Sequence, residues 1–333
     1  MMIDYADVIY GLAWGDEGKG KIANALAEKY DCVCRWNGGP NAGHTVYRNG
    51  KRYKTHLVPS GIFADKQCVI GPGCVINPDK FFEEIRYLRS EGFNTSLIKI
   101  HPNAHIITPE HIEYDTKHLG YLGTTKQGIA PCYAAKMMRS GKRVKDVFDS
   151  QWLLKDELRG KILCEGAQSV WLDIDHGDYP YVTSSTTMPY GACSLGFSPH
   201  KISRLIGVAK IYDTKSGTDP LFPSSLWDDK ELDAVLQAGG EFGTTTGRKR
   251  LVNWLNLDKL IQSITLSGCT ELIINKCDVL EKVGFFKVYH KGTLHNFKDL
   301  GEMKVFIIDA IGEAQDDGSN IHSITFSAHQ EAL

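Results

Sequence analysis

The sequence of 333 residues lacks an excess of either charge, with 38 Lys and Arg against 40 Asp and Glu. A protein that binds DNA or RNA through the phosphate backbone generally carries a basic patch or stripe. We therefore expect no nucleic-acid polymer as a partner. Nucleotide monomers remain open, because a few local hydrogen-bond donors are enough to hold them.

Long apolar runs are also missing. No stretch approaches the roughly 18 uninterrupted apolar residues that a membrane-spanning helix needs, so we expect no membrane segment. Residues 1–7 contain acids and no basic region ahead of an apolar stretch, so we expect no signal peptide. The nine cysteines lack paired metal spacing. Cys32 and Cys34 are interpreted as a buried apolar pair on one face of a strand rather than a zinc half-site, in a reducing cytoplasm.

Apolar runs alternate with segments of helical period, a pattern that predicts an α/β protein with a central, mostly parallel sheet and flanking helices. A buried strand at 8–12 precedes a Gly-rich turn and a helix over about 19–30. Asn77 and Pro78 predict the N-cap and first residue of a second helix. Further apolar runs predict strands at 161–164, 271–274 and 304–308.

We expect one domain over residues 1–333, because no linker or internal repeat interrupts the pattern. Long loops at the carboxyl ends of parallel strands commonly bind ligands. The Gly-rich, polar segments that we expect to form such active-site loops are 36–44, 121–131, 184–198 and 239–250.

The segment Gly15-Asp16-Glu17-Gly18-Lys19-Gly20-Lys21 has the strand–turn–helix context of a phosphate cradle. Backbone N–H groups at a helix start face an anion, and Lys19 adds a point charge. It departs from a standard P-loop, because Gly20 stands where a metal-binding Ser or Thr is expected. Asp16, inside the loop, is suited to reach Mg²⁺ or to act as a base. The alternative is a simple glycine turn before a helix.

Asn275-Lys276-Cys277-Asp278 follows the predicted strand 271–274 and has the N-K-x-D pattern of guanine-binding sites. The aspartate accepts hydrogen bonds from the guanine N1–H and 2-amino group, while the lysine stem covers the ring. Adenine lacks this pair of donors and would leave the carboxylate unpaired. The pattern therefore favours a guanine nucleotide.

Other polar segments offer groups for binding and proton transfer. The segment 243–250 places threonine hydroxyls beside a cluster of cations, and a guanidinium fork binds a carboxylate through two hydrogen bonds. A solvated basic turn is the alternative. His44 lies in a glycine-flanked turn and suits a general acid, or else it is a hydrogen-bonded structural histidine.

Together these segments resemble the adenylosuccinate synthetase family, in the family's order over residues 7 to about 280. The stretches that carry the resemblance are 14–21 (WGDEGKGK), 41–45 (NAGHT), 123–125 (GTT), 165–168 (EGAQ), 173–177 (DIDHG), 179–185 (YPYVTSS) and 245–248 (TTGR).

The resemblance implies a carbon–nitrogen ligase that works in two steps. Asp16 would take the N1 proton of a 6-oxopurine nucleotide, whose O6 then attacks the γ-phosphate of GTP. His44 would donate to the departing bridge oxygen, and Lys19 with Mg²⁺ would offset the developing charge. Asp16 and the Gly43 carbonyl would hold the metal, and L-aspartate would then displace phosphate at C6.

The resemblance also assigns binding residues. GTP would be held by the loop residues Gly15, Glu17, Gly18, Lys19 and Gly20 and by Lys276 and Asp278. The acceptor nucleotide would be held by Asn41, Thr125, Gln168 and Thr183, and by Arg139 of the other subunit in a homodimer. Aspartate would be bound by Thr245, Thr246, Arg248 and Arg250.

Two segments depart from the family pattern. Residues 215–223 replace the family's RVGAGPFP segment near the ribose, and residues 325–328 replace its C-terminal STGP segment. New acceptors at Ser216, Thr218 or Asp219 would suit dGMP, the acceptor of some phage relatives. The compact length also resembles archaeal and phage-encoded forms. We expect a cytoplasmic protein, in the host cytoplasm if the chain is phage-encoded.

The acceptor therefore stays open between dGMP and IMP, with the altered segment favouring dGMP and the retained Asp16 and guanine motif favouring GTP as donor. Two other classes of function remain: a GTP-binding regulatory module without chemistry, and a small-molecule kinase. The retained Asp16, His44 and Arg248 favour the ligase.

Overall fold

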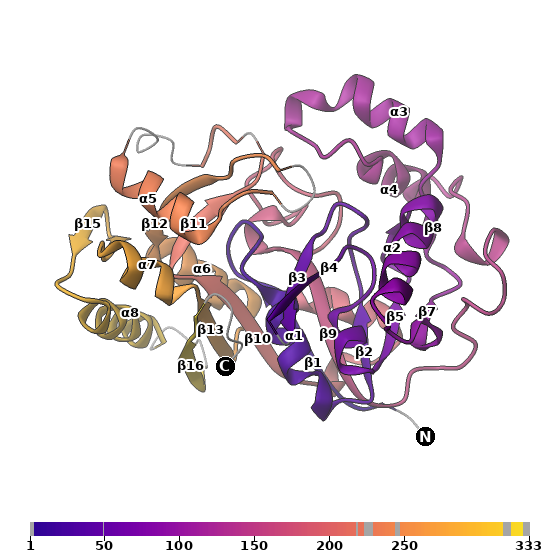
Figure 1. Ribbon diagram of the computed structural model, residues 1–333, viewed down its shortest axis with the longest axis horizontal. Helices are drawn as coiled ribbons and strands as arrows, with labels where there is room; N and C mark the ends of the chain where they lie inside the picture. Colours follow the sequence, from indigo (N-terminus) through magenta and orange to yellow (C-terminus); the bar gives the residue numbers. More distant parts are fainter. Residues whose placement is uncertain are drawn as a thin grey trace.

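The computed structural model describes residues 3–48, 50–217, 219–222, 229–243, 247–315 and 321–328. These residues form a central sheet flanked by helices, with smaller sheets around it (Figure 1). The predicted fold class, an α/β protein built on a mostly parallel sheet, is confirmed. No helix within the described ranges is long and apolar enough to cross a membrane.

In the described part of the chain the central sheet has eight strands, and every neighbouring pair runs parallel. Parallel neighbours need crossover connections, which place helices on the faces of the sheet. In spatial order the strands are β16 (Ser323–Phe326), β13 (Glu271–Asn275), β10 (Ile202–Lys210), β1 (Ile3–Gly11), β9 (Gly160–Ser169), β2 (Cys32–Arg35), β5 (Gln67–Ile70) and β7 (Ile98–Ile100).

The remaining elements surround this sheet. A second sheet contains β11 (Tyr212–Lys215), β12 (Leu251–Asn256), β14 (Lys287–His290) and β15 (Thr293–Asn296). Two strand pairs are β3 (His44–Arg48) with β4 (Lys51–Thr55) and β6 (Val75–Ile76) with β8 (His105–Ile106). The α-helices are α1 (Lys19–Leu26), α2 (Pro78–Ser90), α3 (Pro109–His118), α4 (Ile129–Met137), α5 (Lys230–Gly239), α6 (Leu257–Ser267), α7 (Cys277–Val283) and α8 (Leu300–Gln315).

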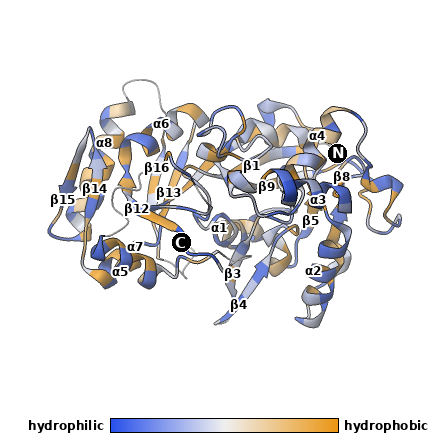
Figure 2. Ribbon diagram, turned by 90° about the horizontal axis from the view of Figure 1, so that it is seen from above, coloured by the Kyte–Doolittle hydropathy of each residue, from blue (hydrophilic) through white to orange (hydrophobic). Residues whose placement is uncertain are grey.

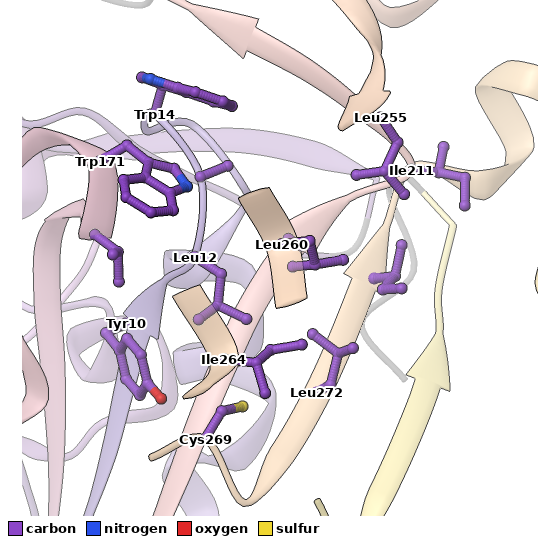
Figure 3. Close-up of a cluster of buried hydrophobic side chains, with 14 of the residues drawn as sticks. Tyr10, Leu12, Trp14, Trp171, Ile211, Leu255, Leu260, Ile264, Cys269 and Leu272 are labelled. Carbon is purple, nitrogen blue, oxygen red and sulfur yellow. The ribbon is translucent and has the colours of Figure 1, made fainter. Parts of the chain in front are cut away.

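Both faces of the central sheet are covered, as the side chains of β1 show. Ile9 packs with α1 residues in one hydrophobic cluster. Tyr10 and the following Leu12 point to the opposite face, where α6 covers the sheet. Figure 2 shows hydrophobic residues concentrated on the central strands. The phosphate-loop residue Trp14 joins the same cluster, so the loop starts from a packed platform whose labelled members include Trp171, Leu260, Ile264 and Leu272 (Figure 3).

Several predicted elements are confirmed. The first strand and the helix after it appear as β1 and α1, and a 3-10 turn over Ala27–Lys29 extends α1. Asn77 caps α2 by accepting a hydrogen bond from the Lys80 N–H at 3.1 Å, and Pro78 is the first helical residue. The strands at 161–164 and 271–274 lie within β9 and β13.

The strand predicted at 304–308 is wrong, because these residues lie in α8. A short apolar run has no period of its own, so it does not distinguish a strand from a buried helix. The buried positions are Met303, Ile307 and Ile311, which follow helical spacing, whereas Val305 and Ile308 are exposed. The helical spacing can be recognised only when the flanking residues Met303 and Ile311 are considered together with the run 304–308.

The Cys32 and Cys34 side chains lie on one face of β2, with their sulfur atoms 3.4 Å apart, and both are buried. The described residues contain no group of three or more His, Cys, Asp or Glu that could hold a metal ion. The interpretation as a buried pair is therefore the one that fits.

Candidate active site

The carboxyl ends of β9 and β13 and the loop that follows β1 open onto one cavity of about 460 Å³. This is the edge of a parallel sheet where ligands are expected to bind. All four Gly-rich segments, together with the phosphate loop, contribute residues that line the cavity. Residues with predicted roles that line it are Gly15, Asp16, Glu17, Gly18, Lys19, Gly20, Asn41, Gly43, His44, Thr125, Gln168, Thr183, Ser216, Arg250 and Lys276.

Other predicted site residues lie off the cavity wall. Asp219 is buried and pairs with the Lys215 ammonium at 2.6 Å, so its carboxylate is already engaged within the altered segment. Arg248 is exposed, and Asp278 lies half-buried in the first turn of α7. Arg139 is exposed just after α4. Thr218, Thr245 and Thr246 lie outside the described residues.

The phosphate loop ends at the start of α1, whose N-cap is Gly18 in the left-handed conformation with φ 94°. Backbone N–H groups at this helix start are positioned for an anion. The Lys19 ammonium is 2.7 Å from the Glu17 carboxylate, which also accepts hydrogen bonds from the Gly15 N–H and the Ser169 hydroxyl. Glu17 thus braces the loop from within, and Lys19 is held at its rim.

The glycine at position 20, which breaks the P-loop pattern, has a steric cause. A Cβ atom at Gly20 would lie 2.8 Å from both the His44 Cβ and the Ser60 Oγ. Real Cβ atoms essentially never approach other atoms this closely, so a Ser or Thr here would push His44 aside. The missing hydroxyl at position 20 therefore follows from the position of His44, which occupies the space that a larger residue would need.

The Asp16 carboxylate is held by two neighbours at the cavity wall. The Arg250 Nε lies 2.8 Å from Asp16 Oδ2, and the Ser216 hydroxyl donates to the same oxygen at 3.0 Å. Burial alone would raise the pKa of Asp16, but Arg250 and then Lys210 lower it below its ordinary value. Asp16 is therefore an ionised acceptor. Ser216, expected near the sugar of the acceptor nucleotide, instead contacts Asp16.

His44 is buried between a cation and an anion. Its Nδ1 contacts the Arg35 guanidinium at 2.9 Å and also the Glu165 carboxylate. Burial and then Arg35 lower the pKa of His44 to about 4, although Glu165 opposes them. The imidazole is therefore neutral at neutral pH. The contact with Arg35, which can only donate, requires Nδ1 as an acceptor and the ring proton on Nε2, whereas the contact with the ionised Glu165 requires the proton on Nδ1, so the tautomer depends on which of the two contacts Nδ1 makes.

Two amide side chains on the cavity wall have unpaired buried oxygens. Asn41 Oδ1 and Gln168 Oε1 have no hydrogen-bond partner among the described residues. A buried carbonyl oxygen without a partner costs roughly 1–3 kcal/mol, so such atoms generally await a ligand or water. Both residues were expected to hold the acceptor nucleotide.

The Lys276 ammonium is bound at 2.5 Å by the Glu241 carboxylate and at 2.9 Å by the Gly239 carbonyl. With its charged end tied down, Lys276 offers its aliphatic stem to the cavity, as a ring-covering residue requires. Asn275 connects this motif to the phosphate loop, because its amide donates to the Glu17 carbonyl at 2.7 Å.

Backbone strain is concentrated at this site. Non-glycine residues with positive φ in the described part of the chain are Asp16, Asp65, Lys126, Arg139, Gln168, Lys276 and Lys291. Asp16, Gln168 and Lys276 line the cavity, and Arg139 is the residue assigned to a neighbouring subunit. Left-handed backbone is costly for side chains other than glycine and clusters where function needs it.

The altered C-terminal segment lies beside the guanine motif. β16 pairs in parallel with β13, and the Cys277 N–H donates to the Ser327 carbonyl at 3.1 Å. The Lys21 ammonium donates to the Ala328 carbonyl at 2.6 Å and to Asn275 Oδ1 at 2.8 Å. This segment therefore supports the N-K-x-D motif from the side away from the cavity and is not among the residues that line the cavity.

Sequence reasoning gave no role to four buried groups, Arg35, Glu165, Lys210 and Glu241. Their contacts join segments far apart in the chain, so spacing carried no signal for Arg35 or Lys210. Glu165 and Glu241, however, lie within the segments 165–168 and 239–250 that the sequence had singled out. A buried acid at the end of a strand or beside such a loop was the available signal.

Comparison with known proteins agrees with this geometry. The family model for adenylosuccinate synthetase matches residues 8–160 and 153–298. The adenylosuccinate synthetase of Heliobacterium modesticaldum is 40% identical over 340 residues, covering 84% of this chain and 79% of that protein. The adenylosuccinate synthetase of Shouchella clausii is 39% identical with the same coverage.

Solved structures are also similar. The fully ligated adenylosuccinate synthetase from Plasmodium falciparum has a TM-score of 0.80 and 27% identity, covering 97% of this chain and 96% of that chain. The cyanophage S-2L succinoaminodeoxyadenylate synthetase, bound to dGMP and dATP, has a TM-score of 0.69 and 22% identity, covering 92% and 99%, and shares the fold. From the extent of these matches, the chain belongs to the adenylosuccinate synthetase family, ligases that join aspartate to a purine nucleotide.

Proposed function

We propose that this ligase uses GTP to join L-aspartate to C6 of dGMP through a 6-phosphoryl intermediate, giving N6-succino-2-amino-2′-deoxyadenylate. Support for GTP comes from the guanine motif, where Lys276 lines the cavity that also holds the phosphate loop. IMP, which would give adenylosuccinate, is the second candidate. It is favoured by the relatives in the comparison, which are named adenylosuccinate synthetases.

The acceptor preference rests on one observation, the unpaired buried oxygens of Asn41 and Gln168. Because Asp16 takes the N1–H, the donors left on guanine are the two N–H groups of its 2-amino group, whereas hypoxanthine has no such group. A base with these donors can relieve the desolvation cost of the two amide oxygens, and a base without them leaves both unpaired. The pair of acceptors therefore favours the 2-amino base.

In the proposed reaction Asp16 accepts the N1 proton, and the purine O6 attacks the γ-phosphorus as the bond to the bridge oxygen breaks. In the tautomer whose Nδ1 accepts from Arg35, the neutral His44 donates a hydrogen bond from Nε2 to that departing oxygen, and Lys19 offsets charge on the phosphates. The amino group of aspartate then bonds to C6 while the C6–O bond breaks and phosphate leaves. Arg250, and Arg248 with the Thr245–Thr246 segment, would hold the aspartate carboxylates.

Adenylosuccinate synthetases use Mg²⁺ with GTP, and the residues here fit that ion. The Asp16 carboxylate and the Gly43 carbonyl both line the cavity and are oxygen donors of the kind Mg²⁺ prefers. The described residues offer no cluster of three or more acidic or other metal-binding side chains. This suits an ion that takes most ligands from phosphates and water. When bound, Mg²⁺ would offset charge on the β- and γ-phosphates.

The deciding experiment measures phosphate release from GTP with L-aspartate and either dGMP or IMP. Turnover that needs aspartate and is faster with dGMP is expected. Turnover with IMP alone would replace the acceptor assignment, and release that does not need aspartate would leave a kinase or a GTP-binding module. Asp16→Ala should abolish phosphate release, because no other carboxylate lining the described cavity contacts Arg250 and Ser216.

Removing the Asn41 side chain tests whether its unpaired oxygen selects the acceptor nucleotide. Asn41→Ala should reduce the preference for dGMP over IMP, measured as the ratio of kcat/KM values, by about tenfold, the value of one hydrogen bond. Thr125→Ala, on the same wall, is the control. An unchanged ratio in Asn41→Ala would show that this oxygen does not read the 2-amino group.

We also propose that the enzyme is a homodimer in which Arg139 acts on the site of the other subunit. Arg139 follows the exposed Met137 and Met138, which are 72% and 70% exposed and suited to a subunit interface. Mixing Arg139→Ala with Asp16→Ala chains should restore part of the activity, because a mixed dimer keeps one intact site. A mixture as inactive as its components would refute action in trans.

A further inference from the structure

Glu241 lies just beneath the cavity wall, after α5, and its side chain is completely buried. Its carboxylate accepts hydrogen bonds from Lys276 at 2.5 Å, Arg250 at 2.5 Å and the Tyr212 hydroxyl at 2.8 Å. Lys210 lies 3.4 Å from the same carboxylate. One buried acid therefore receives four side chains from different elements.

The two oxygens of Glu241 serve different ends of the cavity. Oε1 binds the Lys276 ammonium of the guanine motif, and Oε2 binds the Arg250 guanidinium. Arg250 in turn contacts Asp16 Oδ2 at 2.8 Å through its Nε. A continuous chain of charged contacts thus runs from the base end of the cavity to the acid of the phosphate loop.

The Glu241 carboxylate is needed to offset the repulsion between the cations around it. Three cations, Lys210, Lys276 and Arg250, surround it, and Asp16 supplies the remaining contacting acid. Mutual repulsion of the cations would push their flexible side chains apart without Glu241. Burial favours loss of its charge, but Lys210, Lys276 and Arg250 hold the pKa of Glu241 well below its ordinary value. It is therefore ionised at neutral pH.

We propose that Glu241 is a positioning residue that couples recognition of the donor base at Lys276 to phosphoryl transfer at Asp16 and Arg250. The inference rests on the proposed function for the roles of these three residues. Base binding that fixes Lys276 also fixes Glu241, and through it Arg250. Misplacement of a catalytic group by about 1 Å can cost on the order of 100-fold in rate, so even a small shift is measurable.

The test compares Glu241→Gln with the wild type by steady-state kinetics and by GTP binding without acceptor. We expect the KM for GTP to rise about tenfold and kcat to fall at least about tenfold, because both ends lose one anchor. The KM for the acceptor nucleotide should change by less than about twofold. Glu241→Gln with wild-type KM for GTP and wild-type kcat would overturn the proposal.

A double variant separates positioning from charge compensation. Lys210 does not line the cavity, and Glu241→Gln with Lys210→Met has the wild-type net charge. If Glu241 positions Lys276 and Arg250, the double variant regains thermal stability but not the KM for GTP. Recovery of both would show that Glu241 only balances charge, and would overturn the inference. The double variant also keeps the test usable if the single variant unfolds.

Tyr212→Phe is the matched control, because it removes one neutral hydrogen bond to the same carboxylate and no charge. We expect less than about a threefold change in either constant. An effect on the KM for GTP as large as that of Glu241→Gln would overturn the assignment to the charged contacts. Wild-type protein that binds GTP but does not join aspartate would instead fail the proposed function, and GTP affinity of the variants would still test the coupling.

Discussion

Two buried glutamates organise the two sides of the cavity in different ways. Glu165, on β9, accepts hydrogen bonds from the Ser60 backbone N–H and hydroxyl, both at 2.7 Å, and contacts His44 and Arg35. Glu241 contacts three cations and one tyrosine hydroxyl. Glu165 extends from a strand of the central sheet and receives two neutral donors from Ser60, whereas Glu241 is held by long charged side chains from several elements.

The difference separates two tasks. Glu165 orients one titratable ring, so its loss should affect chemistry and leave donor binding nearly intact. Glu241 sets the mutual positions of several charges, so its loss should affect binding and chemistry together. Burial raises the pKa of Glu165, but His44 and Arg35 outweigh it and bring the pKa to about 2. Both acids are therefore permanently charged near neutral pH, and the contrast lies in their partners.

Removing the charge of Glu165 should give the largest effect. Glu165→Gln takes away the anion beside His44 and leaves Arg35 without its carboxylate, so we expect kcat to fall about 100-fold or more. The KM for GTP should stay within about twofold, in contrast to Glu241→Gln. Steady-state phosphate release measures both constants.

Ser60→Ala is the control for Glu165→Gln, because it removes only one neutral hydrogen bond to that carboxylate. A kcat loss below about fivefold is expected. If Glu165→Gln raised the KM for GTP and left kcat unchanged, the separation of tasks between the two glutamates would be wrong.

The close approach of Gly20 to His44 offers a second way to disturb the Glu165–His44 side of the cavity without changing the Glu241 side. Gly20→Ser should displace His44, since its Cβ would meet the His44 Cβ at 2.8 Å. We expect kcat to fall between about tenfold and 100-fold, although the new hydroxyl supplies the residue that a standard P-loop has after its lysine.

Gly312→Ala in α8, where an added Cβ meets no atom within 4 Å, should leave kcat unchanged. Higher activity in Gly20→Ser than in the wild type would mean that the loop tolerates a metal-binding hydroxyl and that His44 has another role.

The pH dependence of stability sharpens the comparison with the smallest expected effect. The pKa of His44 is lowered from 6.5 to about 4 by burial and then by Arg35, so between these values the unfolded chain binds a proton that the folded protein does not. The associated stability is present above the unfolded pKa of 6.5 and is lost as the pH falls toward 4. Between pH 6.5 and about 4, the melting temperature of His44→Asn should therefore fall by a few degrees less than that of the wild type.

Asp213 works in the opposite direction. Burial raises its pKa to about 7, so the folded protein takes up a proton there first and gains stability as the pH falls. For this reason the difference between wild type and His44→Asn is the informative quantity. Parallel melting curves for the two proteins would contradict the neutral, buried state of His44.

Local patterns predicted the parts of the fold that local physics decides. The Gly-rich turn after β1 and the cap at Asn77 follow from backbone freedom and capping chemistry within a few residues. Local patterns did not predict the structure of the run 304–308, because its five residues fit a strand and a helix equally well. Packing of Met303, Ile307 and Ile311 against the core decided the helix.

Motifs located the cavity but not the contacts within it. The N-K-x-D motif and the phosphate loop lie together as expected, yet Asp219 is engaged with Lys215 and Ser216 with Asp16. Glu165 and Glu241 act on partners brought close by the tertiary fold, and no spacing rule encodes such pairs. Their identification required the packed structure.

The contacts of Lys21 constrain the order in which parts of the protein can fold. It lies in the first helix to be synthesised, but its ammonium bonds to Asn275 and to the Ala328 carbonyl, 254 and 307 residues later. Contacts so distant along the chain form late and slowly. During synthesis these contacts of Lys21 cannot form before β16 joins β13. The brace between the helix after the phosphate loop and the segment at Ala328 is therefore completed only after residue 328 has left the ribosome.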